Sequence, residues 1–520
     1  MLTVNFLSWI LALLPVILIL LLMMGFNWGG SKASSLTWLV TQILAVTFFG
    51  GSFKLLGYTY VKAFFLSVDV LMILWGAMFL YQMTRKAGTI QVIGKFLSEL
   101  TENRAFLGIF LGWLFPSFLQ GMGGFGVPVA VSAPLLVSAG IAPTLAVIIT
   151  SIGHGWGVTF GSMGSSFRTM MSVTGLSESY LAPFSAILLG SASLLCGLMV
   201  IYLAGGKKKF LSAVPLTVLC SLILFFGEYI LATNGLWVIS VTVPSMLALI
   251  FSFFYQRFFS KYSKNFLASK SKEEIKELLS TLIPYIVLVT LIVIVNFVQP
   301  LRTLFDGFEI GFDLPELSTS FGYVTQAGRS KEINPFLHPG TIIFIATIIS
   351  FILLKRKKYF EGGELKEIAQ TTFKRSLNSS IAIFSLVGTA VLMNHVEMTS
   401  ILALGISKVV NGNIYPLISP FIGALGAFIT GSNNNSNVLF ANLQLQTAEI
   451  LKISVPLILA AQTSGGALSS IMAPAKVIIG CSTVGLAGKE GDVIGKLILY
   501  TTTLVLIIGI LALILSRVVN

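Results

Sequence analysis

The stretch FITGSNNNSNV, residues 428–438, puts four asparagines and two serines into the middle of a long apolar run. The 520-residue chain around it is 55% hydrophobic and only 10% charged, whereas about 25% of the residues of a soluble domain are charged. Such a composition predicts an integral membrane protein. The question is why this polar stretch lies among segments that are compatible with a bilayer.

About twelve apolar segments have roughly the 20-residue length of a membrane-spanning helix. They lie near 5–24, 36–57, 62–83, 143–166, 184–204, 211–231, 235–256, 279–299, 340–354, 377–394, 455–480 and 494–515. Two more apolar stretches, 105–138 and 414–451, are broken in the middle by glycines or amides, and we expect each to be a hairpin that enters and leaves on one side. The predicted fold class is an all-α polytopic membrane protein with these transmembrane helices plus two re-entrant hairpins.

The formal charge of +13 comes from basic residues in short loops between the predicted spans. Three clusters stand out, at 207–209, at 257–276 and at 355–375. Two predicted spans separate each cluster from the next, so all three lie on one side, which the positive-inside rule makes cytoplasmic. The loop 300–339 is then external. We interpret the charge as a topology signal in the cell membrane, with the lipid bilayer as partner and no nucleic acid.

A second stretch, FLQGMGGFGVP (118–128), resembles the first, and the unit 65–175 recurs at 377–487. Gly121 matches Gly431, Thr150 and Ser151 match Thr463 and Ser464, Gly153 matches Gly466, and Gly76 matches Gly388. A basic pair follows the first span of one copy but precedes the matching span of the other, so the copies are predicted to point in opposite directions. Inverted repeats with interrupted helices that meet at the midplane are typical of secondary transporters.

The repeat suggests four regions. These are N-terminal helices at 1–60, a first repeat at 61–205, connecting helices at 206–376 and a second repeat at 377–520.

The hairpin tips are the predicted binding region. Glycine lets the backbone approach a ligand closely, and a helix that begins after each tip would aim its positive dipole end at an anion. The tip residues concerned are Gln120, Gly121, Gly123, Gly124, Phe125 and Gly126, with Ser432, Asn433, Asn434, Asn435, Ser436 and Asn437. The amides suit a small hydroxylated anion or a desolvated cation; alternatively they cap the half-helices and bond one another.

Polar groups in the matched spans complete the candidate site. Thr463, Ser464 and Gly465 suggest an unwound mid-span near the tips, although Ser and Thr in helices also bond their own backbone. Ionisable residues among apolar ones are functional candidates, which selects Lys476 and, as proton-coupling candidate, His154. Lys476 could instead snorkel to an interface. His338, His395, Glu178, Glu228 and Glu397 are interpreted as boundary residues.

The stretches FLQGMGGFGVPVAVSAPLL, FITGSNNNSNVLFANLQLQTAEI and QTSGGALSSIMAPAKVIIGCSTVGLAGKEGD resemble the L-lactate permease family of bacterial secondary transporters. The resemblance implies a proton-coupled carrier of L-lactate and related 2-hydroxymonocarboxylates such as glycolate. It implies matching tip residues at Gly121, Gly124, Phe125, Gly126 and Pro128, at Thr430, Gly431, Ser432, Ser436 and Asn437, and at Thr463 to Gly466.

This chain departs from the family pattern at four positions. Gln120 stands where the family usually has an acid, Asn433 where it has aspartate, His154 where it has asparagine, and Ser470 where it has lysine. Lys476 could restore the missing positive charge. Three mechanisms stay open: His154 carries the proton, the substrate crosses as the neutral acid, or the coupling ion is not a proton.

Other classes are less favoured. No nucleophile-base set, paired carboxylates or metal-ligand spacing indicates an enzyme, a cofactor or a metal site, and channel filters usually come from oligomeric repeats. Cys196, Cys220 and Cys481 lie far apart in apolar segments, where we expect them to be buried. The prediction is a transporter of a small organic anion, coupled to protons or, as the alternative, to sodium or to no ion.

Overall fold

The computed structural model describes residues 5–124, 126–259, 270–305 and 307–519. Over these residues the chain is helical, apart from turns and four two-residue strands. The predicted all-α polytopic membrane fold is confirmed. Eight described helices are long and apolar enough to cross a membrane, or up to ten if each of two bent pairs is one span. The number of spans predicted from the sequence stays a prediction.

The N-terminal part holds two helices and then the first copy of the repeat. The elements are α1 (Phe6–Leu20), η1 (Leu21–Gly25), α2 (Gly30–Phe48), α3 (Phe53–Lys86), α4 (Thr89–Ser98), α5 (Arg104–Leu107), η2 (Gly108–Leu114), α6 (Phe115–Gly123), α7 (Val127–Ser138), α8 (Pro143–Gly155), η3 (Trp156–Val158) and α9 (Gly161–Thr174). The first hairpin is α5 to α7, and the broken span after it is α8 to α9, which bends by 46°.

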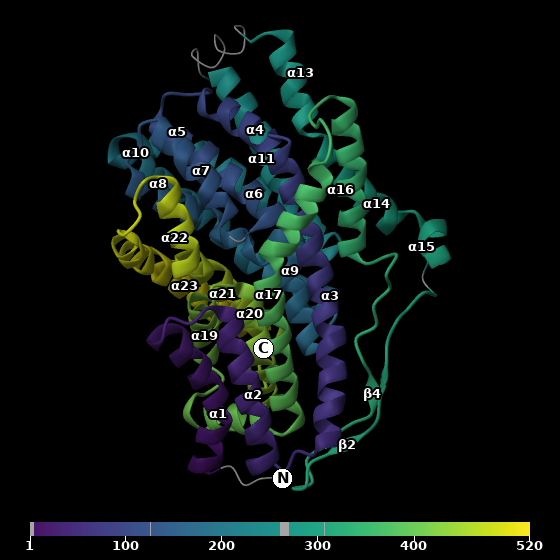
Figure 1. Ribbon diagram of the computed structural model, residues 1–520. Helices are drawn as coiled ribbons and strands as arrows, with labels where there is room; N and C mark the ends of the chain where they lie inside the picture. Colours follow the sequence, from purple (N-terminus) through teal and green to yellow (C-terminus); the bar gives the residue numbers. More distant parts are fainter. Residues whose placement is uncertain (1–4, 125, 260–269, 306, 520) are drawn as a thin grey trace.

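The connecting part contains α10 (Glu178–Thr233), η4 (Trp237–Ile239), α11 (Thr242–Phe259), α13 (Lys272–Thr281), α14 (Ile283–Phe297), α15 (Gln299–Phe305) and α16 (Pro339–Arg356). Gly206 leaves the helical conformation inside α10, at φ 66 and ψ 178, which separates the two spans predicted there. Four strands, β1 (Asp313–Leu314), β2 (Leu317–Ser318), β3 (Val324–Thr325) and β4 (Gly328–Arg329), pair antiparallel as β1 with β4 and β2 with β3. They lie at the opposite end of the molecule from α13 (Figure 1).

The second copy has the same order of elements. It comprises α17 (Glu364–His395), α18 (Met398–Val409), the second hairpin α19 (Tyr415–Thr430) and α20 (Asn433–Leu451), the broken span α21 (Val455–Ser469), η5 (Ser470–Met472) and α22 (Pro474–Thr483), and the closing helix α23 (Glu490–Val519). Both hairpins break where the sequence predicts, and a helix begins directly after each tip. Gly126 at φ 85 and Gly431 at φ 75 make the turns, since glycine adopts positive φ without strain.

The matching long helices α3 and α17 lie antiparallel and side by side. Lys86, at the end of α3, pairs with Glu367, at the start of α17, at 2.7 Å. At the other end, Lys62 Nζ lies 3.3 Å from His395 Nε2. His395 is only 3% exposed, so its assignment to a boundary surface was wrong: the contact between the two long helices covers it. The inversion of the two whole copies stays a prediction.

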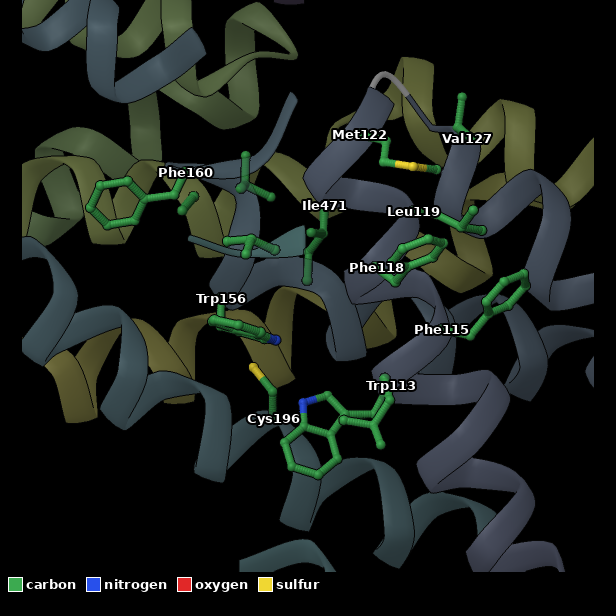
Figure 2. Packing of buried hydrophobic residues seen from close by; sticks show 14 of the residues in the cluster. Trp113, Phe115, Phe118, Leu119, Met122, Val127, Trp156, Phe160, Cys196 and Ile471 are labelled. Carbon is green, nitrogen blue, oxygen red and sulfur yellow. The ribbon is translucent and has the colours of Figure 1, made fainter. Parts of the chain in front are cut away.

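Each hairpin packs against its broken span through glycine. A Cβ on Gly153 would lie 1.8 Å from the carbonyl oxygen of Gly112, and in the second copy a Cβ on Gly466 would lie 3.3 Å from the carbonyl oxygen of Gly423. The large side chains of Trp113 and Trp156 pack in the buried core of the first copy, with Cys196 beside them (Figure 2). The Trp156 indole donates to Ser117 Oγ at 3.0 Å. As expected, all three cysteines are buried.

Candidate functional site

The tip of the second hairpin carries its amides on the first turns of α20. Asn433 Nδ2 donates to Thr159 Oγ1 at 3.1 Å and to Thr463 Oγ1 at 3.2 Å. Asn437 Nδ2, one turn later, donates to the same Thr463 hydroxyl at 2.9 Å and to the Ser166 carbonyl at 3.0 Å. The asparagines thus connect α20 to both broken spans, rather than bonding only one another.

The break between α8 and α9 is the central element of this site; the sequence interpretation expected the matched spans to be broken but did not place the break at these residues. Ser162, Met163 and Gly164 have left-handed backbone conformations, at φ 48, 55 and 73. Left-handed backbone costs about 1–2 kcal/mol for a residue with a side chain, so surrounding contacts have to hold this turn open. The signal in the sequence was the run of glycines and serines at 157–166.

The residues around this break contact both hairpin tips. On one side, the Gly124 N–H of the first tip donates to Ser162 Oγ at 2.8 Å. On the other side, Ser166 Oγ donates to Asn434 Oδ1 in a very short hydrogen bond, and Ser165 Oγ lies 3.5 Å from the same oxygen. We call residues 159–166 the bridging segment, because they join the two tips.

The glycines of the first tip serve packing. A Cβ on Gly121 would lie 2.3 Å from Thr242 Oγ1, and one on Gly123 would lie 3.0 Å from the Tyr81 side chain. Gly124 is close to the side chains of Ser162 and Gln120. These neighbours are parts of the protein, so the close approach that glycine permits here is between helices. Phe125, also predicted at this tip, lies outside the described residues.

The second broken span corrects one prediction. Thr463, Ser464 and Gly465 lie inside the continuous helix α21, and the break comes later, at Ser470 to Ala473. Gly465 supports close helix packing, because its Cβ would lie 1.8 Å from the Pro420 carbonyl oxygen. Thr463 still belongs to the site, since its hydroxyl accepts from two asparagines.

Several buried polar atoms of the described site have unused hydrogen-bonding capacity. At the hairpin tips and the neighbouring part of α21, these side-chain atoms lack a partner among the described residues: Asn433 Oδ1, Asn434 Nδ2, Asn437 Oδ1, Gln120 Oε1 and Ser464 Oγ. Burying a polar group without a partner costs free energy, so such a cluster is suited to a polar guest. The oxygen and nitrogen of each amide follow from its hydrogen bonds.

A cavity of about 230 Å³ lies beside the second tip. Residues of the tip line it from one side, and residues of α2 and α17 line it from the other; they include Ser432, Asn434, Asn435, Ser31, Asn378 and Ser379. Ser436 faces away from this cavity and donates to the Gly423 carbonyl at 2.7 Å. The amides at 434 and 435 therefore reach an opening, whereas Ser436 fixes the hairpin.

His154 and Lys476 are both buried, at 1% and 9% exposure. His154 Nδ1 lies 2.6 Å from the Thr150 carbonyl, so this nitrogen carries the proton and Nε2 is left without a partner in the described structure. Lys476 Nζ donates to Ser470 Oγ at 3.0 Å. Lys476 thus does not snorkel to a surface, and its ammonium lies beside the position of the family's lysine.

Two carboxyl groups emerge that the sequence interpretation overlooked or misplaced. Asp69, on α3, is fully buried and forms an ion pair with Arg168 of α9. His338, interpreted as a boundary residue, is 3% exposed and contacts Asp69. Glu228 was also assigned to a boundary, yet it is 0% exposed and neither carboxyl oxygen has a described partner.

The boundary assignments failed for one reason. Each residue was assigned to a boundary because it lies near the end of an apolar segment. That position in the sequence does not show whether a neighbouring helix or loop covers the residue. Lys331, which lies outside the spans, is also largely covered by the protein, and this burial lowers the pKa of its ammonium group.

An all-helical chain with two interrupted hairpins around a buried polar centre is a multi-pass protein of the cell membrane. Residues 8–519 match the L-lactate permease family. The chain therefore belongs to this family of permeases.

Known relatives are similar over most of their length. An L-lactate permease of Streptococcus iniae is 27% identical over 474 residues, covering 88% of this chain and 94% of the relative. The glycolate permease GlcA of Escherichia coli (strain K12) is 24% identical over 551 residues, covering 98% and 95%. The solved structure of the MtrF efflux pump of Neisseria gonorrhoeae is 14% identical, covers 92% of this chain and 83% of its own, and has a TM-score of 0.37.

Proposed function

We propose that this protein is a secondary active transporter that imports L-lactate or a related small 2-hydroxymonocarboxylate, such as glycolate, by proton symport and alternating access. The observation that carries the proposal is the bridging segment, which contacts both hairpin tips in the buried centre of a permease-family chain. A solute held there would touch both halves at once.

The chemistry of the site supports a small hydroxylated anion. Asn434 Nδ2 is an unpaired donor, and Asn433 Oδ1 and Asn437 Oδ1 are unpaired acceptors among the described residues. A 2-hydroxy acid needs donors for its carboxylate and an acceptor for its hydroxyl. The N–H groups of the first turn of α20 add the positive end of a helix dipole beside the cavity. Together these groups can replace the water that the solute loses.

Alternating access is supported by the way the two copies pack. The same two positions, Gly112 with Gly153 and Gly423 with Gly466, meet in each copy, and the matching helices α3 and α17 run antiparallel. In an inverted repeat, two similar halves can exchange the open and closed arrangements around a central site. The bridging segment contacts both tips and would therefore sense movement of either hairpin.

A sodium-coupled or facilitative carrier of another small organic anion is the second candidate. It is favoured by the amides at 120 and 433 and by two amide oxygens without a described partner, Asn433 Oδ1 and Asn437 Oδ1, one helical turn apart. Carbonyl-type oxygens suit a hard cation such as Na⁺. Ion dependence of uptake distinguishes the two candidates.

The test is uptake of labelled L-lactate and glycolate into proteoliposomes that contain the purified protein. When the outside medium is made more acidic than the liposome interior and no sodium is present, we expect the labelled acid to accumulate inside. Without a pH gradient, we expect the labelled acid only to reach the same concentration on both sides. Accumulation that requires a sodium gradient would support the second candidate. No uptake of either acid by folded protein, under any gradient, would refute the proposed substrate class.

A further inference from the structure

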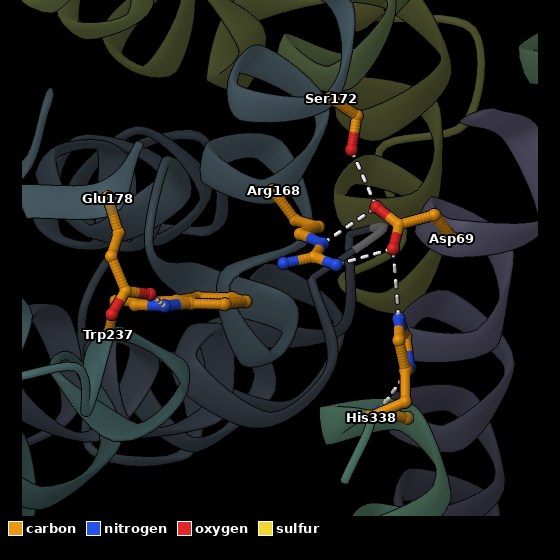
Figure 3. Close-up of polar contacts among 7 residues, drawn as sticks. Asp69, Arg168, Ser172, Glu178, Trp237 and His338 are labelled. Carbon is orange, nitrogen blue, oxygen red and sulfur yellow. Dashed lines mark hydrogen bonds and ion pairs between the residues drawn. The ribbon is translucent and has the colours of Figure 1, made fainter. Parts of the chain in front are cut away.

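The residues around Asp69 form a polar cluster, built on one ion pair, that the proposed mechanism does not use. Asp69 accepts from Arg168 through both carboxylate oxygens, at 2.7 Å from Nε and 2.5 Å from Nη2. Ser172 Oγ donates to Oδ2 at 2.6 Å, and His338 Nε2 lies 3.3 Å from Oδ1 (Figure 3). Three elements, α3, α9 and the loop before α16, thus meet at one carboxylate.

The protonation of His338 follows from its second ring nitrogen. Its Nδ1 accepts from the Gly340 N–H at 3.1 Å, so the ring proton is on Nε2 and is donated to Asp69. A neutral histidine therefore faces the pair, and Arg168 supplies the balancing charge. Asp69 thus accepts hydrogen bonds from Arg168, Ser172 and His338 together. Lys331, in the loop 300–339, lines the same cavity as Ser172.

A buried ion pair is a poor way to gain stability. Desolvation of both charges offsets most of their attraction, and apolar replacements often match the stability of such pairs. Ionisable groups within membrane spans are, by default, candidates for function. Here the pair joins α3, which packs along α17, to α9, which begins in the bridging segment.

The position of Arg168 on α9 connects the pair with the second tip. Ser165, Arg168 and Ser172 are spaced i, i+3 and i+7, so they share one face of the helix. Ser165 lies at Asn434 of the second tip, and Ser172 lies at Asp69. Arg168 is between them, about one turn from the amide cluster.

Arg168 and Ser172 also line two cavities that reach the loop 300–339. Arg168 lines a cavity of about 240 Å³ with Glu178, Trp237 and Arg302. Ser172 lines another, of about 680 Å³, with Lys62, Lys331 and Glu332. The carboxylate of Asp69 itself is not exposed. Protons and anions can thus approach Arg168 and Ser172 from the side of the loop 300–339.

The Asp69 carboxylate binds the Arg168 guanidinium in the way that the carboxylate of an organic acid could bind it. The planar fork of arginine binds one carboxylate through two parallel hydrogen bonds, and Asp69 fills both positions. We propose that Asp69 and Arg168 form the exchange switch of this carrier, in which Arg168 binds the carboxylate of the substrate once a proton neutralises Asp69. This inference rests on the proposed function.

The charges of this exchange balance. Asp69 takes up one proton and becomes a neutral carboxylic acid, which no longer holds the guanidinium as an ion pair. One substrate carboxylate, with its negative charge, then takes its place on Arg168. The buried region keeps the same net charge before and after, so one proton and one anion travel together. Release of the anion on the other side leaves Arg168 free to recover Asp69, which gives up its proton.

Two assays on the full-length protein in liposomes test the switch. Exchange of labelled for unlabelled L-lactate at equal pH needs substrate binding but no net proton movement, whereas accumulation under a pH gradient needs both. We expect Asp69→Asn, which resembles the protonated acid, to keep exchange within about threefold of wild type and to lose accumulation. Accumulation by Asp69→Asn equal to that of wild type would overturn the proposal.

A second variant keeps the test decisive if Asp69→Asn does not fold. Arg168→Lys retains the positive charge beside Asp69 but cannot form the two-pronged contact. We expect it to raise the KM of exchange at least about tenfold with a smaller change in the maximal rate. An unchanged KM in folded Arg168→Lys would overturn the assignment of the carboxylate to Arg168.

A further variant separates this switch from another buried titratable group. Glu228→Gln is expected to keep accumulation, because Glu228 has no described hydrogen-bond partner and does not contact the pair. Loss of accumulation in Glu228→Gln, with retention in Asp69→Asn, would assign the proton elsewhere and overturn the proposal. If wild-type protein neither exchanges nor accumulates L-lactate or glycolate, the proposed function itself fails, and this result is distinguishable from failure of the switch.

Discussion

The two hairpin tips arise from matching stretches of sequence, yet the structure uses them differently. The first tip is lined by glycines that bring helices into contact, as Gly121 does with Thr242. The second tip offers amide groups, of which Asn433, Asn434 and Asn437 each keep one unpaired atom among the described residues. We infer that the first tip positions the helices and that the second meets the solute.

The difference extends to the breaks in the following spans. The break after α8 lies between the tips and bonds to both, through Ser162 and Ser166. The break after α21 begins directly after Ser469, and Lys476 follows it. We infer that the two matching stretches form similar hairpins, whereas their side chains and the breaks that follow them take different parts in the proposed site.

The largest expected effect tests the packing role of the first tip. Gly121→Ala would put a Cβ 2.8 Å from the backbone nitrogen of Thr242, which cannot move aside as a side chain can. We expect it to destabilise the fold by about 3 kcal/mol. The matched variant, Gly431→Ala, meets nothing within 4 Å but has φ +75, so its cost is about 1 kcal/mol.

Melting of both variants in detergent measures this contrast. Gly57→Ala, in α3, is the control for a glycine with open space and ordinary backbone. Equal melting temperatures for Gly121→Ala and Gly431→Ala would mean that the two tips do not differ in packing.

The next effect concerns transport through the second tip. Asn437→Ala removes hydrogen bonds to Thr463 and to the Ser166 carbonyl, and each such loss in a buried site costs about 1–3 kcal/mol. We expect uptake to fall by about tenfold or more while the protein stays folded. Gln446→Ala is the control on the same helix, because Gln446 bonds Asn394 instead of the bridging segment. A similar loss in both variants would assign the effect to α20 as a whole.

An intermediate effect is expected when Asn433 of the second tip is replaced by aspartate, the residue that the family usually has there. Asn433→Asp loses the amide donor to Thr159 and Thr463, and it buries a carboxylate with no cation in hydrogen-bond contact among the described residues. The neutral acid resembles the amide, so uptake by this variant should recover as the pH falls. Uptake rates over a pH series, compared with those of wild type, test this. A variant whose pH profile matches wild type would show that position 433 does not contact the solute.

The sequence could predict the hairpins because their signals are local. Apolar runs interrupted by glycine or asparagine specify where a helix cannot continue in a bilayer, and the matching stretches identified the repeat. The amides at 433, 434 and 437 were also found directly, because a cluster of six polar residues in an apolar run requires polar partners within the protein or a polar solute. The N-termini of α7 and α20 follow the tips, since a new helix begins where the interrupted backbone becomes regular again.

The bridging segment and the switch could not be found in this way. Thr159 and Ser166 become site residues only because the second hairpin, about 270 positions later in sequence, packs against them. Asp69 and Arg168 lie 99 residues apart, Asp69 is the single acidic residue of α3, and Arg168 is the single charged residue of α9. Partners joined only by tertiary packing leave no periodic or local pattern.

The smallest expected effect tests whether the second tip depends on hydrogen bonds of defined length or only on the presence of polar side chains. Ser165 and Ser166 both offer a hydroxyl to Asn434 Oδ1, but the distance from Ser165 is 3.5 Å, the limit of a useful hydrogen bond. Ser165→Ala should change uptake by less than about twofold, whereas Ser166→Ala leaves the Asn434 oxygen without its short bond and should reduce uptake several-fold. Initial uptake rates of the two variants measure the difference. If both substitutions slow uptake to the same extent, the length of the hydrogen bond to Asn434 does not matter for transport. The proposed difference between a first tip held by packing and a second tip held by defined hydrogen bonds would then be refuted.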